Sequence, residues 1–138
     1  MRIMGLDVGT KRIGVALSDE LFITAQGSAT IERKTLESDL EEIKRVAREN
    51  SVEEIVVGLP ISMNGSYSEQ TRKVVEFKDS LSKAVDIPVV TWDERLTTVQ
   101  AERTLLEADV SRAKRRKAID KLAAQAILQN FLDSRKRG

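Results

Sequence analysis

The sequence predicts an α/β protein in which helices cover a mixed five-stranded sheet. Residues 2–8 and 12–18 both have the apolar composition of buried strands, and only three residues join them. Two strands joined by so tight a turn must be antiparallel. The later strand-like segments are separated by segments of helical period, which is typical of parallel strands with right-handed crossovers. A chain of 138 residues has the size of one domain, so we expect residues 1–138 to form a single unit.

The individual elements follow from local patterns along the chain. The expected order is strands at 2–8, 12–18 and 22–31, a helix at 35–50, a strand at 53–58, a helix to about residue 85, a strand at 88–92, and helices at 97–107 and 115–132. Ser66 and Glu69 have capping-box spacing, which predicts the start of the second helix. Residues 109–114 are expected to form a polar, basic loop.

The absence of two residue types restricts the chemistry. The chain has no His, which excludes a Ser-His-Asp triad, a His general base and imidazole ligands for zinc. It has no Cys, which excludes thiolate catalysis and thiolate metal sites. Any acid–base or metal chemistry must therefore depend on carboxylates, whose oxygens suit Mg²⁺ or Mn²⁺.

The charge is distributed unevenly, although the net charge is only +1. Residues 111–138 contain nine Lys and Arg and two acidic residues, a net of +7, whereas the rest of the chain has a net of −6. A basic segment on an acidic body suits an anionic partner such as nucleic acid, although a solubilising helix would have the same composition. We find no membrane-length apolar run and no signal peptide, and therefore expect a cytoplasmic protein without a membrane partner.

Three acidic residues stand out by their positions. Asp7 lies inside the first strand, Glu94 follows the last strand, and Asp120 begins the apolar face of the final helix. If the first and last strands are parallel, their carboxyl ends meet at one sheet edge, where α/β proteins bind ligands. Three acids gathered there could hold one or two Mg²⁺ ions, which would activate a water and stabilise a phosphodiester transition state.

Each acid also has a purely structural interpretation. Asp7 could form an ion pair with Arg12 or Lys11, or accept hydrogen bonds from turn amides. Glu94 could pair with Arg95. Asp120 could be a surface residue paired with Lys117 or Arg116. We favour the functional interpretation for Asp7 and Asp120, because a carboxylate inside an apolar strand or core stripe is costly unless it is paired or bound to a metal.

Basic and hydroxyl side chains border the same predicted edge. Residues 111–117 include five basic side chains and no aromatic ones, which suits phosphate contacts and not base reading. Lys11 and Arg12 follow the first strand directly. Thr97 and Thr98 could cap the next helix and leave its amides available to a phosphate.

Four segments, in order, resemble motifs of one known family. They are GLDVGTKRIGVALSD (5–19), VVGLP (56–60), DERLTT (93–98) and DKLAAQAIL (120–128). Together they resemble the YqgF family of Holliday-junction resolvase-like proteins, within the ribonuclease H-like superfamily. The resemblance implies a five-stranded sheet in the order 3-2-1-4-5 with strand 2 antiparallel. It also implies a nuclease that processes the precursor of small-subunit ribosomal RNA or cuts branched DNA.

The resemblance extends to particular residues. By match to the motifs, Asp7, Glu94 and Asp120 would be the catalytic acids that bind Mg²⁺ or Mn²⁺. The residues expected to contact nucleic acid are Thr10, Lys11, Arg12, Arg95, Thr97, Thr98, Arg112, Lys114, Arg115, Arg116 and Lys117. Resolvases of this kind act as symmetric dimers, so a homodimer is also considered.

Two other functions remain open from the sequence. The Asp-x-Gly-Thr segment at residues 7–10 also resembles the first phosphate loop of sugar kinases and actin-like ATPases, but those need a second such domain, which this chain lacks. A non-catalytic RNA- or DNA-binding factor would use the basic segment equally well. It would have no use for Asp7 and Asp120 beside phosphates.

Overall fold

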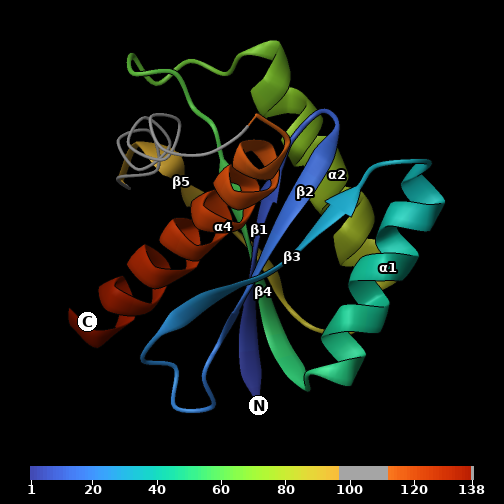
Figure 1. Ribbon diagram of the computed structural model, residues 1–138. Helices are drawn as coiled ribbons and strands as arrows, with labels where there is room; N and C mark the ends of the chain where they lie inside the picture. The colour runs from blue at the N-terminus through green and yellow to red at the C-terminus, as the bar shows by residue number, and fades with distance from the viewer. Residues whose placement is uncertain (97–111, 138) are drawn as a thin grey trace.

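The computed structural model describes residues 1–96 and 112–137, with the side chains of 1–95 and 120–135. Five strands form one sheet in the order β3-β2-β1-β4-β5 (Figure 1). The strands are β1 (Arg2–Val8), β2 (Arg12–Ser18), β3 (Ala25–Glu32), β4 (Val52–Leu59) and β5 (Val89–Asp93). β2 is antiparallel to β1 and β3, whereas β4 is parallel to β1 and β5. The predicted mixed sheet and its order are confirmed.

Two layers of helix cover the sheet (Figure 1). The first layer contains α1 (Leu36–Glu49) and α2 (Glu69–Ala84), which enclose the larger apolar core with Met4, Leu6 and Val8 of β1. The other face carries α4 (Arg112–Arg137), which packs on Ile3, Ala16 and Val56. Alternate residues of a strand point to opposite faces, so Asp7 lies on the α4 side with Ile3 and Gly5.

The expected starts of β3 and α2 are wrong, and each error has a local cause. β3 begins at Ala25, not residue 22, because the Asp19 carboxylate accepts hydrogen bonds from the Ile23 and Thr24 amides and holds a turn there. Ser68, not Ser66, is the N-cap of α2, and its capping-box partner is Thr71. Ser66 instead hydrogen-bonds Asn64 in a turn at Gly65, where φ is +86°.

The final helix is longer than predicted at both ends. It begins at Arg112, so the expected loop over 109–114 is wrong from residue 112 onward. Lys, Arg and Ala favour helix, and no Gly or Pro interrupts the run. At the other end, Arg135 forms an ion pair with Glu54 of β4 and lies over the Phe131 ring. The helix expected at 97–107 lies outside the described residues. In the described part of the chain, no helix combines the length and apolarity needed to cross a membrane.

Candidate active site

Asp7 is a nearly buried carboxylate at the end of a central strand. Its relative exposure is 9%, and it lies on the face of the sheet that α4 covers. Its cross-strand partner on β2 is Gly14. Partners in an antiparallel pair point to the same face, so the missing side chain of Gly14 leaves space beside Asp7 on that face.

The backbone of Asp120 fills that space. A Cβ added at Gly14 would lie 2.6 Å from the Asp120 carbonyl carbon and 3.3 Å from its Cα. The helix therefore rests directly on Gly14, one strand away from Asp7. Asp120 is placed by this backbone contact, and its carboxylate accepts a hydrogen bond from Arg12 Nε at 2.8 Å.

Glu94 lies on the same face of the sheet and comes from the β5 edge. It is the first residue of a short 3-10 helix, η1 (Glu94–Leu96), that follows β5. Its Cγ lies 3.2 Å from the position of a Cβ added at Gly58. Gly58 follows Val57, whose partner on β1 is Leu6, so Gly58 lies beside Asp7 on the α4 face. Glu94 thus packs against β4 over a residue without a side chain, on the face that also carries Asp7.

The three acids lie on, or pack against, the α4 face of the sheet and do not form a closed metal cage. Among the side chains that the structure describes, no three Asp, Glu, His or Cys residues are grouped closely enough to hold an ion by themselves. Mg²⁺ usually takes one or two protein carboxylates and completes its shell with water and phosphate oxygens. Carboxylates from the sheet and from α4, on the same face, are oxygen donors of the kind that such a shell needs.

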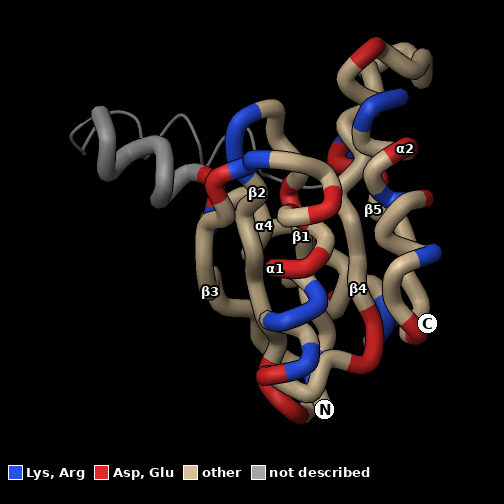
Figure 2. Tube along the Cα trace, turned by 90° about the vertical axis from the view of Figure 1, so that its right-hand side faces the viewer, with Lys and Arg blue, Asp and Glu red and all other residues tan. Residues whose placement is uncertain are grey.

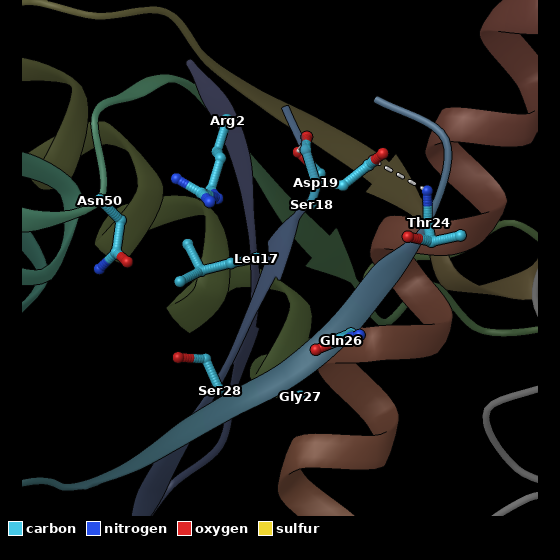
Figure 3. Close-up of a pocket in the computed structure, with 9 residues that line it drawn as sticks. All are labelled: Arg2, Leu17, Ser18, Asp19, Thr24, Gln26, Gly27, Ser28 and Asn50. Atoms are coloured by element: carbon cyan, nitrogen blue, oxygen red, sulfur yellow. Dashed lines mark hydrogen bonds between the residues drawn. The ribbon is translucent and has the colours of Figure 1, made fainter. Parts of the chain in front are cut away.

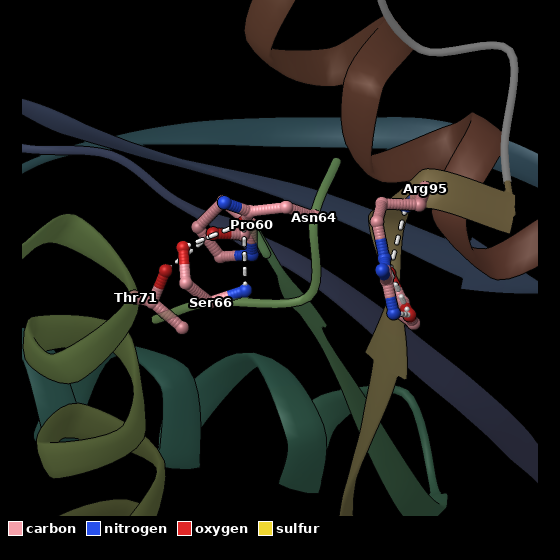
Figure 4. Close-up of polar contacts among 6 residues, drawn as sticks. Pro60, Asn64, Ser66, Thr71 and Arg95 are labelled. Atoms are coloured by element: carbon pink, nitrogen blue, oxygen red, sulfur yellow. Dashed lines mark hydrogen bonds and ion pairs between the residues drawn. The ribbon is translucent and has the colours of Figure 1, made fainter. Parts of the chain in front are cut away.

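The described arginines at this edge are engaged by carboxylates, including Arg33, which donates to the Gly9 carbonyl and pairs with Asp39. Arg12 pairs with Asp120, whereas Arg95 pairs with Asp93 through Nε and Nη2 at 2.6–3.1 Å (Figure 4). The hydrogen bond from Arg95 holds the pKa of the Asp93 carboxyl below its usual range. Among the described side chains, Arg95 pairs with Asp93, and Asp120 pairs with Arg12 of β2. The expected partners Arg116 and Lys117 have side chains outside the description.

The structure describes only some of the other residues predicted to contact nucleic acid. Thr10 and Lys11 are exposed in the turn between β1 and β2, which a hydrogen bond from the Gly9 amide to the Arg12 carbonyl closes. Acidic and basic positions are interspersed near this end of β1 and β2 (Figure 2). Thr97 and Thr98 lie outside the described residues. The backbone of Arg112, Lys114, Arg115, Arg116 and Lys117 forms the start of α4, and their side chains lie outside the description.

Sequence reasoning missed the features that support the acids. Gly14 and Gly58 lie inside strands, where glycine weakens the sheet unless another backbone or side chain approaches closely. A glycine inside a predicted strand was therefore the available sequence signal for both close contacts. Sequence reasoning places a loop between β4 and α2 but does not predict its approach to Arg95, whose Nη1 would be 3.7 Å from a Cβ at Gly65. The Thr71 hydroxyl donates to the Pro60 carbonyl and anchors this loop at its start (Figure 4).

A separate polar pocket lies at the opposite end of the sheet. Arg2, Ser18, Asp19, Gln26 and Asn50 are among its lining residues (Figure 3). Ser18 Oγ accepts from the Ile3 amide at 2.8 Å, and Asp19 accepts from the Thr24 amide at 3.0 Å. The hydrogen bond from Thr24 is also the main cause of the lowered pKa of Asp19. These groups serve the turn between β2 and β3.

The strand order and the strand directions define the fold class. This is the ribonuclease H-like fold. The chain belongs to the RuvX family, whose family-wide sequence profile is described as "Holliday junction resolvase" and matches residues 1–134. RuvX is another name for the YqgF family, so the family that the four motifs predict is confirmed.

Individual relatives agree with this membership. A protein from Halothermothrix orenii is 57% identical over 133 residues, covering 96% of this chain and 95% of the relative. One from Desulforamulus reducens is 55% identical over 134 residues, covering 97% and 98%. Both carry the name "Putative pre-16S rRNA nuclease".

Solved structures share the fold at low sequence identity. RuvC of T. thermophilus, in complex with a Holliday junction substrate, matches with a TM-score of 0.60 and 14% identity, over 99% of this chain and 96% of that one. The Fowlpox virus resolvase, in complex with Holliday junction DNA, matches with a TM-score of 0.59 and 11% identity, over 97% and 98%.

Proposed function

We propose that this protein is a metal-dependent nuclease that hydrolyses phosphodiester bonds in structured nucleic acid, with the precursor of 16S ribosomal RNA as its substrate. The names of relatives more than 50% identical over nearly the whole chain support the substrate. The observation that carries the activity is the stacking of Asp120 on Gly14, the cross-strand partner of Asp7. That contact brings two acids from distant parts of the chain to one edge of the sheet.

Asp7 and Asp120 would hold the divalent cation, with Glu94 contributing across Gly58. A bound Mg²⁺ or Mn²⁺ would activate the attacking water and stabilise the charge that develops on the phosphoryl oxygens. Burial of Asp7 under α4 reduces its contact with bulk water and strengthens its attraction for a cation. The contact of Gly14 with the Asp120 backbone and that of Gly58 with the Glu94 side chain would limit movement of these acids, so little reorganisation would be needed on binding.

The basic residues would grip the substrate through its phosphates. Thr10 and Lys11 are exposed beside Asp7, and the basic run of 112–117 lies on α4 just before Asp120. Contacts of this type recognise the backbone of a nucleic acid and do not read its sequence. Recognition would therefore depend on the shape of the folded substrate. Binding should weaken steeply as the salt concentration rises.

The test compares cleavage and binding for wild type and Asp7→Asn. Labelled pre-16S RNA fragments, a four-way DNA junction and a linear DNA duplex are incubated with Mg²⁺, Mn²⁺ or EDTA. We expect metal-dependent cutting of the RNA, and loss of cutting with retained binding in Asp7→Asn. If both proteins bind equally and neither cuts any substrate, the protein is a binding factor and the proposal is wrong.

A second candidate substrate is branched DNA, because the family description names a Holliday junction resolvase. The same assay separates the two, since preferred cutting of the four-way junction over the RNA would favour the resolvase. A junction has two strands related by a two-fold axis, and paired cuts on them suit a symmetric dimer. Sedimentation of the protein with and without the junction measures whether such a dimer forms.

A further inference from the structure

An ion pair joins Arg12 to Asp120, although the proposed function has Asp120 bind a cation and the sequence predicts that Arg12 contacts a phosphate. Arg12 Nε donates to Asp120 Oδ2 at 2.8 Å across 108 residues of sequence. Both side chains are only 20% exposed. Arg12 lies two residues before Gly14 on β2 and so points to the same face, directly toward the start of the buried part of α4. The contact of Asp120 with Gly14 therefore places the carboxylate within reach of Arg12.

In this pair each residue neutralises the other. Asp120 would need its carboxylate for a cation, and Arg12 would need its guanidinium for a phosphate. We propose that Arg12 is a positioning residue that couples metal binding to nucleic-acid binding. It holds Asp120 while no divalent cation is present, and it turns to a backbone phosphate once a cation occupies the carboxylate. This inference rests on the proposed function.

The chemistry of the two groups supports such an exchange. A partly buried carboxylate without a positive partner is costly, so Asp120 needs Arg12 when the cation is absent. A divalent cation carries twice the charge of a guanidinium and prefers the same carboxylate oxygens. The released guanidinium matches a phosphate in a planar, bidentate geometry. The two binding events must then favour each other by the same factor.

A different arrangement makes the opposite prediction. Arg12 could keep its hydrogen bond to Oδ2 and orient Asp120 for a cation at the other oxygen, as outer hydrogen bonds do at many metal sites. Removal of Arg12 would then weaken metal binding. The sign of the change in metal affinity separates this arrangement from the exchange that we propose.

The first experiment measures Mn²⁺ binding to the full chain by calorimetry in the absence of nucleic acid. Arg12→Gln is compared with wild type and with Lys11→Gln, which removes the same charge from the adjacent exposed residue. We expect Arg12→Gln to bind Mn²⁺ about five-fold more tightly, at the lower end of typical coupling, and Lys11→Gln to change affinity less. Equal changes in the two variants, or weaker binding in Arg12→Gln, would overturn the proposal. Should Arg12→Gln fail to fold, Arg12→Met carries the same comparison, because it also removes the charge and keeps an apolar stem at this partly buried position.

The second experiment measures the affinity for a fluorescent RNA hairpin with Ca²⁺ or with EDTA. We expect Ca²⁺ to raise the affinity of wild type and Lys11→Gln, and to have a clearly smaller effect on Arg12→Gln. An unchanged Ca²⁺ effect in Arg12→Gln would contradict the coupling. Asp7→Asn and Asp120→Asn separate the two levels of inference. If they leave Mn²⁺ binding intact, the proposed site is wrong, whereas if they abolish it while Arg12→Gln behaves like Lys11→Gln, only the role of Arg12 fails.

Discussion

The backbone of Asp120 in α4 packs directly against Gly14 of β2, in the space that a side chain at residue 14 would occupy. A Cβ at this position would overlap the Asp120 carbonyl, with the carbonyl carbon only 2.6 Å away. Because Gly14 is also the cross-strand partner of Asp7, one glycine sets the separation of two acids that are 113 positions apart in the chain. The contact belongs equally to the packing of the fold and to the geometry of the candidate site.

We therefore predict that Gly14→Ala is destabilising. Alanine in a strand normally improves stability over glycine, but here the added methyl group must displace the helix backbone. Overpacking of this kind costs about 1–3 kcal/mol. Urea denaturation followed by the fluorescence of Trp92, the only tryptophan, measures the change, since its ring packs edge-on against Phe131 of α4.

Gly27→Ala is the matched control for Gly14→Ala. A Cβ there would meet the Cβ of Lys121 at 3.0 Å and its carbonyl oxygen at 3.2 Å, so small shifts relieve the contact. We expect a clearly smaller loss of stability. Equal losses in both variants would mean that the Gly14 contact is not special. Metal affinity should fall in Gly14→Ala alone, because only that variant moves Asp120.

Substitutions of Asp93, the last residue of β5, and of the adjacent Glu94 should differ in their effect on cleavage. Glu94 packs over Gly58 on the face that carries Asp7, whereas Asp93 pairs with Arg95. We predict that Glu94→Gln slows cleavage about 100-fold or more, the scale for loss of one positioned acidic group. Asp93→Asn should retain most of the activity. Single-turnover rates at saturating enzyme measure both, and equal rates in the two variants would remove Glu94 from the site.

The start of α2 can be tested with two serines two residues apart. Ser68 Oγ accepts from the Thr71 amide at 3.2 Å, while Ser66 bonds only within the preceding loop among the described contacts. Ser68→Ala should cost about 1 kcal/mol of unfolding free energy, the usual value for loss of an N-cap. Ser66→Ala should cost less. Urea denaturation measures both losses. A larger loss in Ser66→Ala than in Ser68→Ala would favour Ser66 as the N-cap, as the sequence predicts.

Stability should depend on pH through the Asp93–Arg95 pair. Arg95 lowers the pKa of Asp93 in the folded protein, so the pair contributes stability above the ordinary Asp pKa of about 3.9. The contribution disappears as the pH falls through the lower, folded-state pKa. The difference in unfolding free energy between wild type and Asp93→Asn should therefore be largest near neutral pH and shrink in acid. A difference that is constant from pH 7 down to pH 2.5 would contradict this assignment.

Most of the architecture follows from local patterns. The apolar segments of β1 and β2 match their predicted bounds, because a strand bounded by a tight glycine turn leaves little choice of ends. The α1 helix is bounded as its pattern predicts, with Thr35 as N-cap. Errors occur where side chains bind backbone amides over a few residues, as Asp19 does before β3 and Asn64 does before α2. Several such turns compete at similar free energies, and local composition does not separate them.

The sequence by itself determined the mixed sheet and the family, and it named the three candidate acids, since each depends on residue type and on spacing along the chain. Only the tertiary structure decided where those acids lie relative to the sheet and α4. The close approach of α4 to Gly14, the position of Glu94 over Gly58 and the pairing of Arg12 with Asp120 join residues far apart in the chain. Such contacts arise from packing of a helix backbone on a sheet, which depends on the shape of all the layers together and leaves no periodic trace in the sequence.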